Sequence, residues 1–212
     1  MITYETDRLW LRPFCHEDLD LIFRLYTDPE ILRYTPFDVM SKATAKLHLA
    51  RIIQDWEQVP QQSFEFAMIR KEAGDPVGRC HILIDPATDT GMIGWLLLKE
   101  HWGQNYAFES GEALIHCCFE RLGLHRVNAV CNPENMASRR VLERLGLRLE
   151  AHYRKKCRYQ KNGIVSWEDE LEYACLKEEV MKTNDGRSPN RYILESRNKN
   201  FGKSRIAKRP VK

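Results

Sequence analysis

The residues best suited to chemistry lie near the middle of the chain, where an apolar segment ends and a helical pattern begins. Met92-Ile93-Gly94-Trp95-Leu96-Leu97-Leu98 has the composition of a buried strand, and the helical pattern starts at Tyr106. The first turn of a helix has backbone N–H groups without partners and the positive end of the helix dipole. Gly103, in the connection, lets a ligand approach the backbone closely. The junction predicts a phosphate-binding turn, although many glycine-containing turns of this kind bind nothing.

Signatures of other common sites are absent from the sequence. We find no G-x-x-x-x-G-K-[ST], G-x-G-x-x-G, H-E-x-x-H or G-x-S-x-G pattern. The seven cysteines, at positions 15, 80, 117, 118, 131, 157 and 175, include no C-x-x-C pair and no histidine at metal-ligand spacing. We therefore expect neither a metal site nor disulfides, and we interpret most cysteines as small buried hydrophobic residues.

The elements that must position this junction alternate between strand and helix patterns, which predicts an α/β or α+β fold around one sheet. Strand patterns cover residues 9–13, 63–70, 76–84, 91–98, 126–131, 148–159 and 165–176. Helical patterns cover residues 17–27, 41–56, 106–122 and 135–145. Asn162-Gly163, between the last two strand patterns, is a strong hairpin signal.

Composition indicates one globular domain with a basic extension. The chain has 212 residues, 43% of them hydrophobic, and no apolar run reaches the roughly 18 residues of a membrane-spanning helix. Residues 181–212 hold ten Lys/Arg and two Asp/Glu, which leaves a net charge of −5 on residues 1–180 out of a total of +3. We expect a domain over residues 1–178 and a basic, disordered tail over residues 179–212. The tail is interpreted either as an arm that contacts RNA weakly or as a dispensable extension.

The N-terminus lacks a basic start and an apolar stretch, so we expect a cytoplasmic protein.

Three segments resemble one known family. Residues 93–109, which include Trp102-Gly103-Gln104-Asn105-Tyr106-Ala107, are similar to the acetyl-CoA motif of the GNAT superfamily of N-acetyltransferases. Residues 132–147 resemble the N-P-x-N-x-A-S-x-x-V-L-E-K-L-G-F signature of the branch that acetylates the N-termini of ribosomal proteins. Residues 6–13 resemble that branch's opening T-x-R-L-x-L-R-P, so the likeness extends over roughly residues 5–177.

The resemblance implies a mixed central sheet, flanked by helices and splayed open between its fourth and fifth strands, with acetyl-CoA in the gap. The residues that it implies as cofactor contacts are the backbone of Leu96, Leu97 and Leu98 for pantetheine, Trp102, Gly103, Gln104, Asn105, Tyr106 and Ala107 for pyrophosphate, Asn135 and Ser138 near the thioester, and Arg140 for a phosphate. Ser138 is the candidate that returns a proton to the departing thiolate, with Tyr173 or Tyr153 as alternatives. Asn135 is also explained as an ordinary helix cap, and Ser138 as a capping or solvent-facing residue.

The chain departs from the family pattern at two positions. Asn105 stands where the phosphate-binding stretch normally has glycine, and asparagine tolerates left-handed backbone angles better than most residues. Met92 stands where related enzymes often have an acid, and a methionine cannot accept a proton. Two alternatives therefore remain for the general base: water that relays the proton to bulk solvent, or a carboxylate such as Asp89, Glu168 or Asp169. An α-amino group, with a pKa of about 8, demands less of a base than a lysine side chain with a pKa of about 10.4.

The implied activity is acetyl transfer from acetyl-CoA to a primary amine, and the branch implies a protein N-terminal α-amino group, such as that of a ribosomal protein. Two alternatives stay open. Met92, Asn105 and the basic tail favour a catalytically weak module that binds acetyl-CoA or a nucleic-acid partner, as a sensor or ribosome-associated module. The same fold could also act on a small-molecule amine such as an antibiotic or polyamine. The loops around residues 29–40 and 153–168 are expected to select the acceptor, and the sequence leaves open a monomer or a homodimer.

Overall fold

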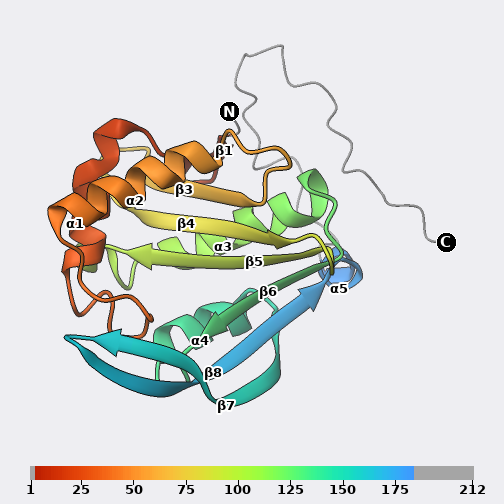
Figure 1. Ribbon diagram of the computed structural model, residues 1–212. Coiled ribbons are helices and arrows are strands. Elements are labelled where there is room, and N and C mark those ends of the chain that lie inside the picture. The colour runs from red at the N-terminus through yellow and green to blue at the C-terminus, as the bar shows by residue number, and fades with distance from the viewer. Residues whose placement is uncertain (1–2, 184–212) are drawn as a thin grey trace.

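The computed structural model describes residues 3–183, which form one eight-stranded sheet with helices on both faces (Figure 1). The helices are α1 (Leu19–Thr27), α2 (Lys42–Asp55), α3 (Tyr106–His116), α4 (Met136–Arg144) and α5 (Lys177–Thr183). The strands are β1 (Tyr4–Glu5), β2 (Leu9–Pro13), β3 (Ser63–Arg70), β4 (Pro76–Asp85), β5 (Thr90–Leu97), β6 (Arg126–Cys131), β7 (Arg148–Lys161) and β8 (Ile164–Leu176). Short 3-10 helices cover His16–Asp18 and Lys99–His101, and a π-helical stretch, Cys117–Arg121, continues α3.

The sheet has the order β1-β2-β3-β4-β5-β6-β8-β7, and β5 with β6 is its one parallel pair. These two strands are the fourth and fifth strands of the sequence prediction, because β1 was not predicted. They pair only where Thr90–Met92 lies beside residues 126–128, and beyond Met92 they diverge (Figure 1). The mixed sheet, splayed between these strands, confirms the predicted fold.

Two apolar layers hold the helices against the sheet. One layer, between α1, α2 and the first half of the sheet, contains Leu25, Leu49 and Ala67. The other, under α3 and α4, contains Phe66, Leu114 and other buried residues that face the opposite way. Figure 1 shows α1 and α2 in front of β3 and β4, whereas the same face of β6, β8 and β7 has no helix over it. We call this uncovered surface of β6, β8 and β7 the open face.

Local sequence signals explain where several elements begin and end. Ser41 caps α2 by accepting a hydrogen bond from the Thr44 N–H at 3.1 Å. Asn162 and Gly163 have φ values of 52° and 78°, which suits the tight turn between β7 and β8. Within residues 3–183, no helix is long and apolar enough to cross a membrane. The predicted tail, apart from the part of α5 beyond residue 178, lies outside the described residues.

Candidate active site

The splay leaves one edge of β5 without a neighbouring strand beyond Met92. The Leu98 N–H donates to the Val77 carbonyl at 2.9 Å, so the backbone of Leu98 faces β4 rather than the split. Because these directions alternate along a strand, Leu96 also faces β4, and Leu97 faces the split. Of the three backbone groups expected to meet a ligand, the geometry therefore leaves Leu97. Its carbonyl already accepts a hydrogen bond from the Trp102 indole at 3.0 Å, and its N–H remains for the ligand.

The start of α3 has the geometry of an anion site. Asn105, directly before the helix, has a left-handed φ of 64°, and Gly103 has a φ of 73°. The first helical hydrogen bond joins the Glu109 N–H to the Asn105 carbonyl at 3.0 Å, and no side chain caps this end of α3. The N–H groups of Tyr106, Ala107 and Phe108 thus have no helical acceptor, and such groups bind phosphate. A pyrophosphate fits these amides.

Other residues of the same connection brace it with their side chains. Tyr106 and Ala107 are buried and anchor the first turn of α3. The Gln104 amide donates to the Glu100 carbonyl at 2.8 Å, and the Gln104 carbonyl accepts from Arg8 at 3.0 Å. Trp102 is 43% exposed, so it packs along the surface of the loop rather than in the core. The connection therefore offers mainly its backbone to a ligand.

Charges around the start of α3 are arranged for an anion. The Glu109 carboxylate, in the first turn, would repel a phosphate, but Arg8 pairs with it at 2.7 Å and holds it against the turn between β1 and β2. Arg144 donates to the Asn105 side chain at 2.9 Å and lies 3.8 Å from the centre of the Phe108 ring. Arg144 was not predicted. It lies one helical turn after Arg140, the predicted phosphate ligand, which is exposed on α4.

The start of α4 brings together Asn135 and Ser138. The Asn135 side chain accepts a hydrogen bond from the Ser138 N–H at 3.1 Å, so Asn135 caps the helix. Ser138 is half-buried in the first turn. The capping role explains Asn135 structurally, and contact of either residue with a cofactor stays a prediction.

Tyr173, on β8, lies under α4. Its hydroxyl donates to Glu143 at 3.1 Å and accepts from Arg139 at 3.4 Å, and both partners are on α4. Burial raises the pKa of this hydroxyl, the hydrogen bond from Arg139 lowers it, and the net shift is upward. β6 separates Tyr173 from the split, because β8 pairs with the far side of β6. Tyr173 thus contacts α4 through Arg139, the residue after Ser138, and its role as a proton donor stays a prediction.

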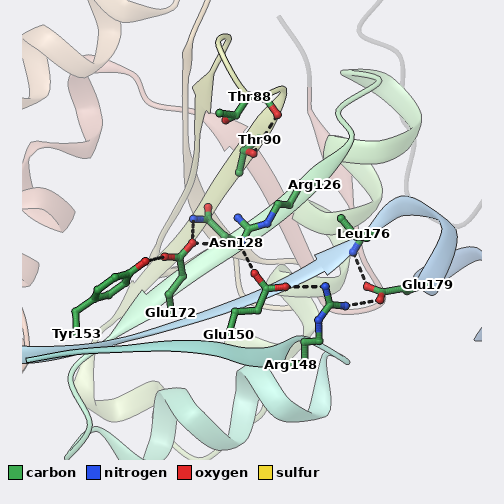
Figure 2. Close-up of polar contacts among 10 residues, drawn as sticks. All are labelled: Thr88, Thr90, Arg126, Asn128, Arg148, Glu150, Tyr153, Glu172, Leu176 and Glu179. Carbon is green, nitrogen blue, oxygen red and sulfur yellow. Dashed lines mark hydrogen bonds and ion pairs between the residues drawn. The ribbon is translucent and has the colours of Figure 1, made fainter.

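The open face carries a polar cluster that the sequence did not reveal, except for Tyr153. Glu172 accepts hydrogen bonds from the Asn128 amide at 2.9 Å and from the Tyr153 hydroxyl at 2.9 Å (Figure 2). Arg126 lies between Glu172, at 3.2 Å, and Glu150, at 2.5 Å. Asn128 is the register partner of Met92, so the cluster begins at the point where β5 and β6 separate. Acidic residues at every second position of β8 were the available signal for it.

Glu172 is held in its charged form. Burial raises its pKa, but hydrogen bonds from Asn128, Tyr153 and Arg126 outweigh burial, so the pKa lies below its ordinary value. The hydrogen bond to Glu172 raises the pKa of Tyr153, which stays a neutral phenol. Of the predicted base candidates, Asp169 is engaged by His152 at 2.8 Å, and Asp89 lies in the turn before β5, at the closed end of the split. The third candidate, Glu168, is paired in register with Cys157, farther along β8 toward the hairpin tip. Glu172, through its hydrogen bond from Asn128, is a carboxylate at the point where β5 and β6 separate.

Comparison with known proteins identifies the family. The model of the acetyltransferase (GNAT) domain matches residues 8–148, about two thirds of the chain. The chain belongs to the GNAT acetyltransferase family. The uncharacterized N-acetyltransferase p20 of Bacillus licheniformis is 34% identical over 154 residues, which cover 71% of this chain and 84% of that protein.

Solved structures agree with this assignment to the GNAT family. The GNAT-family acetyltransferase from Bacillus anthracis has a TM-score of 0.73 at 26% identity, covering 84% of this chain and 99% of that one. RimL, described as a ribosomal L7/L12 alpha-N-protein acetyltransferase in complex with coenzyme A, has a TM-score of 0.69 at 20% identity, covering 81% and 95% of the two chains. The likeness to RimL concerns the fold.

Two loops of this GNAT acetyltransferase meet at the tip of the β7–β8 hairpin, at one end of the open face, and we call them the arch (Figure 1). The arch consists of residues 28–41, between α1 and α2, and residues 159–164, at the tip of the β7–β8 hairpin. The Tyr159 hydroxyl donates to the Tyr34 carbonyl at 2.9 Å, and Lys161 donates to the Leu32 carbonyl at 2.6 Å. The Asn162 N–H donates to Asp38 at 2.9 Å. The two loops that were expected to select the acceptor are thus joined, and the hairpin half of the arch lies beyond the residues that match the family model.

Proposed function

We propose that this GNAT acetyltransferase transfers the acetyl group of acetyl-CoA to a primary amine, and that the amine is the α-amino group at a protein N-terminus. One observation carries the proposal. β5 leads into the anion site at the start of α3. Beyond Met92, the free edge of β5 faces β6 and the open face (Figure 1). A donor bound along β5 and an acceptor on the open face would therefore meet at the split.

The donor side follows from backbone groups of the chain. The amides of Tyr106, Ala107 and Phe108 would bind the pyrophosphate, with Arg144 supplying positive charge next to them. The Leu97 amide would bind the pantetheine arm. Acetyl-CoA supplies an activated acyl group, and Ser138, at the start of α4, is our candidate to return a proton to the sulfur that leaves.

The acceptor side follows from the open face. Glu172 is a carboxylate at neutral pH and would attract an ammonium group, while Met92 beside it presents no acid. An α-amino group has a pKa of about 8, so roughly a tenth of it is already neutral at pH 7, and its proton can pass to water. The two loops of the arch, joined at the hairpin tip, would favour an acceptor that enters end-on as an extended chain. RimL, which shares the fold, is described as acting on such an amine.

An acceptor panel tests the proposal. The protein is incubated with acetyl-CoA and one of three acceptors: peptides with a free N-terminus, the same peptides with a blocked N-terminus and an internal lysine, and small amines including polyamines. Coenzyme A release and product mass are measured. We expect acetylation of the free N-terminus alone. If coenzyme A were released with small amines alone, the acceptor would be a small molecule and not a protein N-terminus. Binding of acetyl-CoA without any release of coenzyme A would support the alternative of a catalytically weak binding module.

A further inference from the structure

A buried polar chain reaches from α1 through β4 toward the split. Arg79, on β4, is buried and forms an ion pair with the buried Glu65 at 2.6 Å. Arg79 also donates a hydrogen bond to the Tyr26 hydroxyl on α1. Such a pair is expensive to bury and needs good geometry, so the guanidinium is held in one place. Arg79 also contacts His81, the next side chain on the same face of β4.

Arg79 fixes the tautomer of His81. The guanidinium nitrogen lies 2.9 Å from Nδ1 of His81, and a guanidinium can only donate, so Nδ1 must be the acceptor. The ring proton of the neutral imidazole is therefore on Nε2. Burial, together with the charge of Arg79, lowers the pKa of His81 to about 3. At physiological pH the ring is a neutral donor with a set orientation, and it cannot serve as a base through Nε2.

His81 lies at the acceptor side of the split. Its register partner is Gly94, two residues beyond Met92 and on the part of β5 whose other edge is free. A Cβ at position 94 would lie 2.5 Å from Cε1 and 2.9 Å from Nε2 of His81, so the ring occupies the space that glycine leaves. Among residues 3–183, Arg79 is the one group that hydrogen-bonds the ring, and His81 is only half-buried. Nε2–H therefore remains for a ligand.

We propose that the Nε2–H of His81 donates a hydrogen bond to the carbonyl oxygen of the first residue of the acceptor. The inference rests on the proposed function and specifies the acceptor as an α-amino amide. A neutral donor cannot hold an ammonium group, but an N-terminal residue has a carbonyl two bonds from its nitrogen. Two different interactions are then available on the two sides of Met92. The carboxylate of Glu172 attracts the ammonium group, and His81 donates a hydrogen bond to the carbonyl. A lysine side chain or an alkylamine has no carbonyl at that distance from its nitrogen.

The test compares two acceptors that differ in their first amide group, with kcat/KM referred to the neutral amine in each case, because loss of the carbonyl raises the pKa of the amine. One is a short peptide with a free N-terminus, and the other has its first amide replaced by an (E)-alkene of the same shape. One neutral hydrogen bond corresponds to a preference of about tenfold in kcat/KM for the amide. His81→Phe keeps the ring but removes the donor, His81→Asn is too short to reach, and His81→Gln retains a donor of similar length.

We expect the wild type and His81→Gln to prefer the amide, and His81→Phe and His81→Asn to treat both acceptors alike with an unchanged KM for acetyl-CoA. His48→Phe is the matched control, because His48 packs on Tyr26 at 4.9 Å between ring centres, whereas the described hydrogen bonds of Arg79 go to Tyr26, Glu65 and His81. It is expected to retain the preference. If the wild type acetylates both acceptors equally, or if a folded donor-free variant still discriminates, the role of His81 is overturned. Acetylation of neither acceptor would instead refute the proposed function.

Discussion

Asn105 offers a prediction whose sign depends on backbone geometry. It stands where the family pattern has glycine, its φ of 64° is left-handed, and its side chain accepts a hydrogen bond from Arg144 at 2.9 Å. We compare Asn105→Gly with Asn105→Ala. Glycine adopts this φ without strain, whereas alanine must adopt it without the local polar contacts that help asparagine.

The two variants should differ by about 1 to 2 kcal/mol, because both lose the hydrogen bond from Arg144 and only alanine bears the cost of the left-handed backbone. A left-handed conformation costs an L-residue about 1 to 2 kcal/mol, and the hydrogen bond from an exposed arginine contributes about 0.5 kcal/mol. Asn105→Ala incurs both losses, which corresponds to roughly 30-fold weaker binding of acetyl-CoA if the turn must form for binding. Asn105→Gly loses the hydrogen bond but relieves the strain, so its affinity should stay within about threefold of the wild type.

Calorimetric titration with acetyl-CoA, together with thermal unfolding, measures these effects. Asn162→Ala is the matched control, because Asn162 also has a positive φ, 52°, but lies in the β7–β8 turn. It should lower the Tm without changing acetyl-CoA affinity. Equal affinity of the alanine and glycine variants would refute the claim that the left-handed turn forms the anion site. If that shared affinity were also lower than the wild type's, the loss would be assigned to the Asn105 side chain.

Three further predictions concern charge and pH. Glu172→Gln should raise the KM for an N-terminal peptide about tenfold and leave the KM for acetyl-CoA unchanged in steady-state kinetics, because an ammonium loses its counter-charge. Burial raises the pKa of Asp18, but hydrogen bonds from Arg12 and from the Cys15 N–H lower it by more, so the native pKa lies below its ordinary value. The charged carboxylate therefore stabilises the fold above about pH 4, and this contribution is lost as the pH falls through the native pKa. Asp18→Asn should therefore cost about 1 to 3 kcal/mol at pH 7 and flatten the acid side of urea unfolding measured against pH. The rate on an N-terminal peptide should rise about tenfold per pH unit below about pH 8 and then level off, whereas a lysine acceptor would keep the rate rising toward about pH 10.

Local patterns in the sequence were enough to place most elements. β2 and β3 have the predicted bounds, since alternation of apolar residues is a property of neighbouring positions. The unusual φ of Asn105 could also be anticipated, because few residues other than glycine and asparagine tolerate it. The change from α-helix to π-helix at Cys117 had no such local cause in the pattern, which continued to Leu122.

The sequence did not predict which side chains of a strand point to which face of the sheet. Glu172 and Tyr173 are neighbours in β8, and one faces the open face while the other lies under α4. A shift of one residue in register exchanges the two, and the alternating acidic residues of β8 do not tell which face the helices cover. The arch depends on contacts such as Tyr159 with Tyr34, which are 125 positions apart. Contacts of this kind leave no periodic trace in the sequence.

The incomplete pairing of β5 has a consequence for the lifetime of the protein. An unpaired strand edge is the surface through which sheets of different chains join, and here it lies inside the sheet beyond Met92. A donor molecule along this edge would take the place of a missing strand, and at a hundredfold excess over its Kd it would add about 2.7 kcal/mol to the stability of the native state. The supply of acetyl-CoA would then govern the resistance of the enzyme to proteolysis and aggregation as well as its rate. A cell short of acetyl-CoA would hold the same chain in a less durable form.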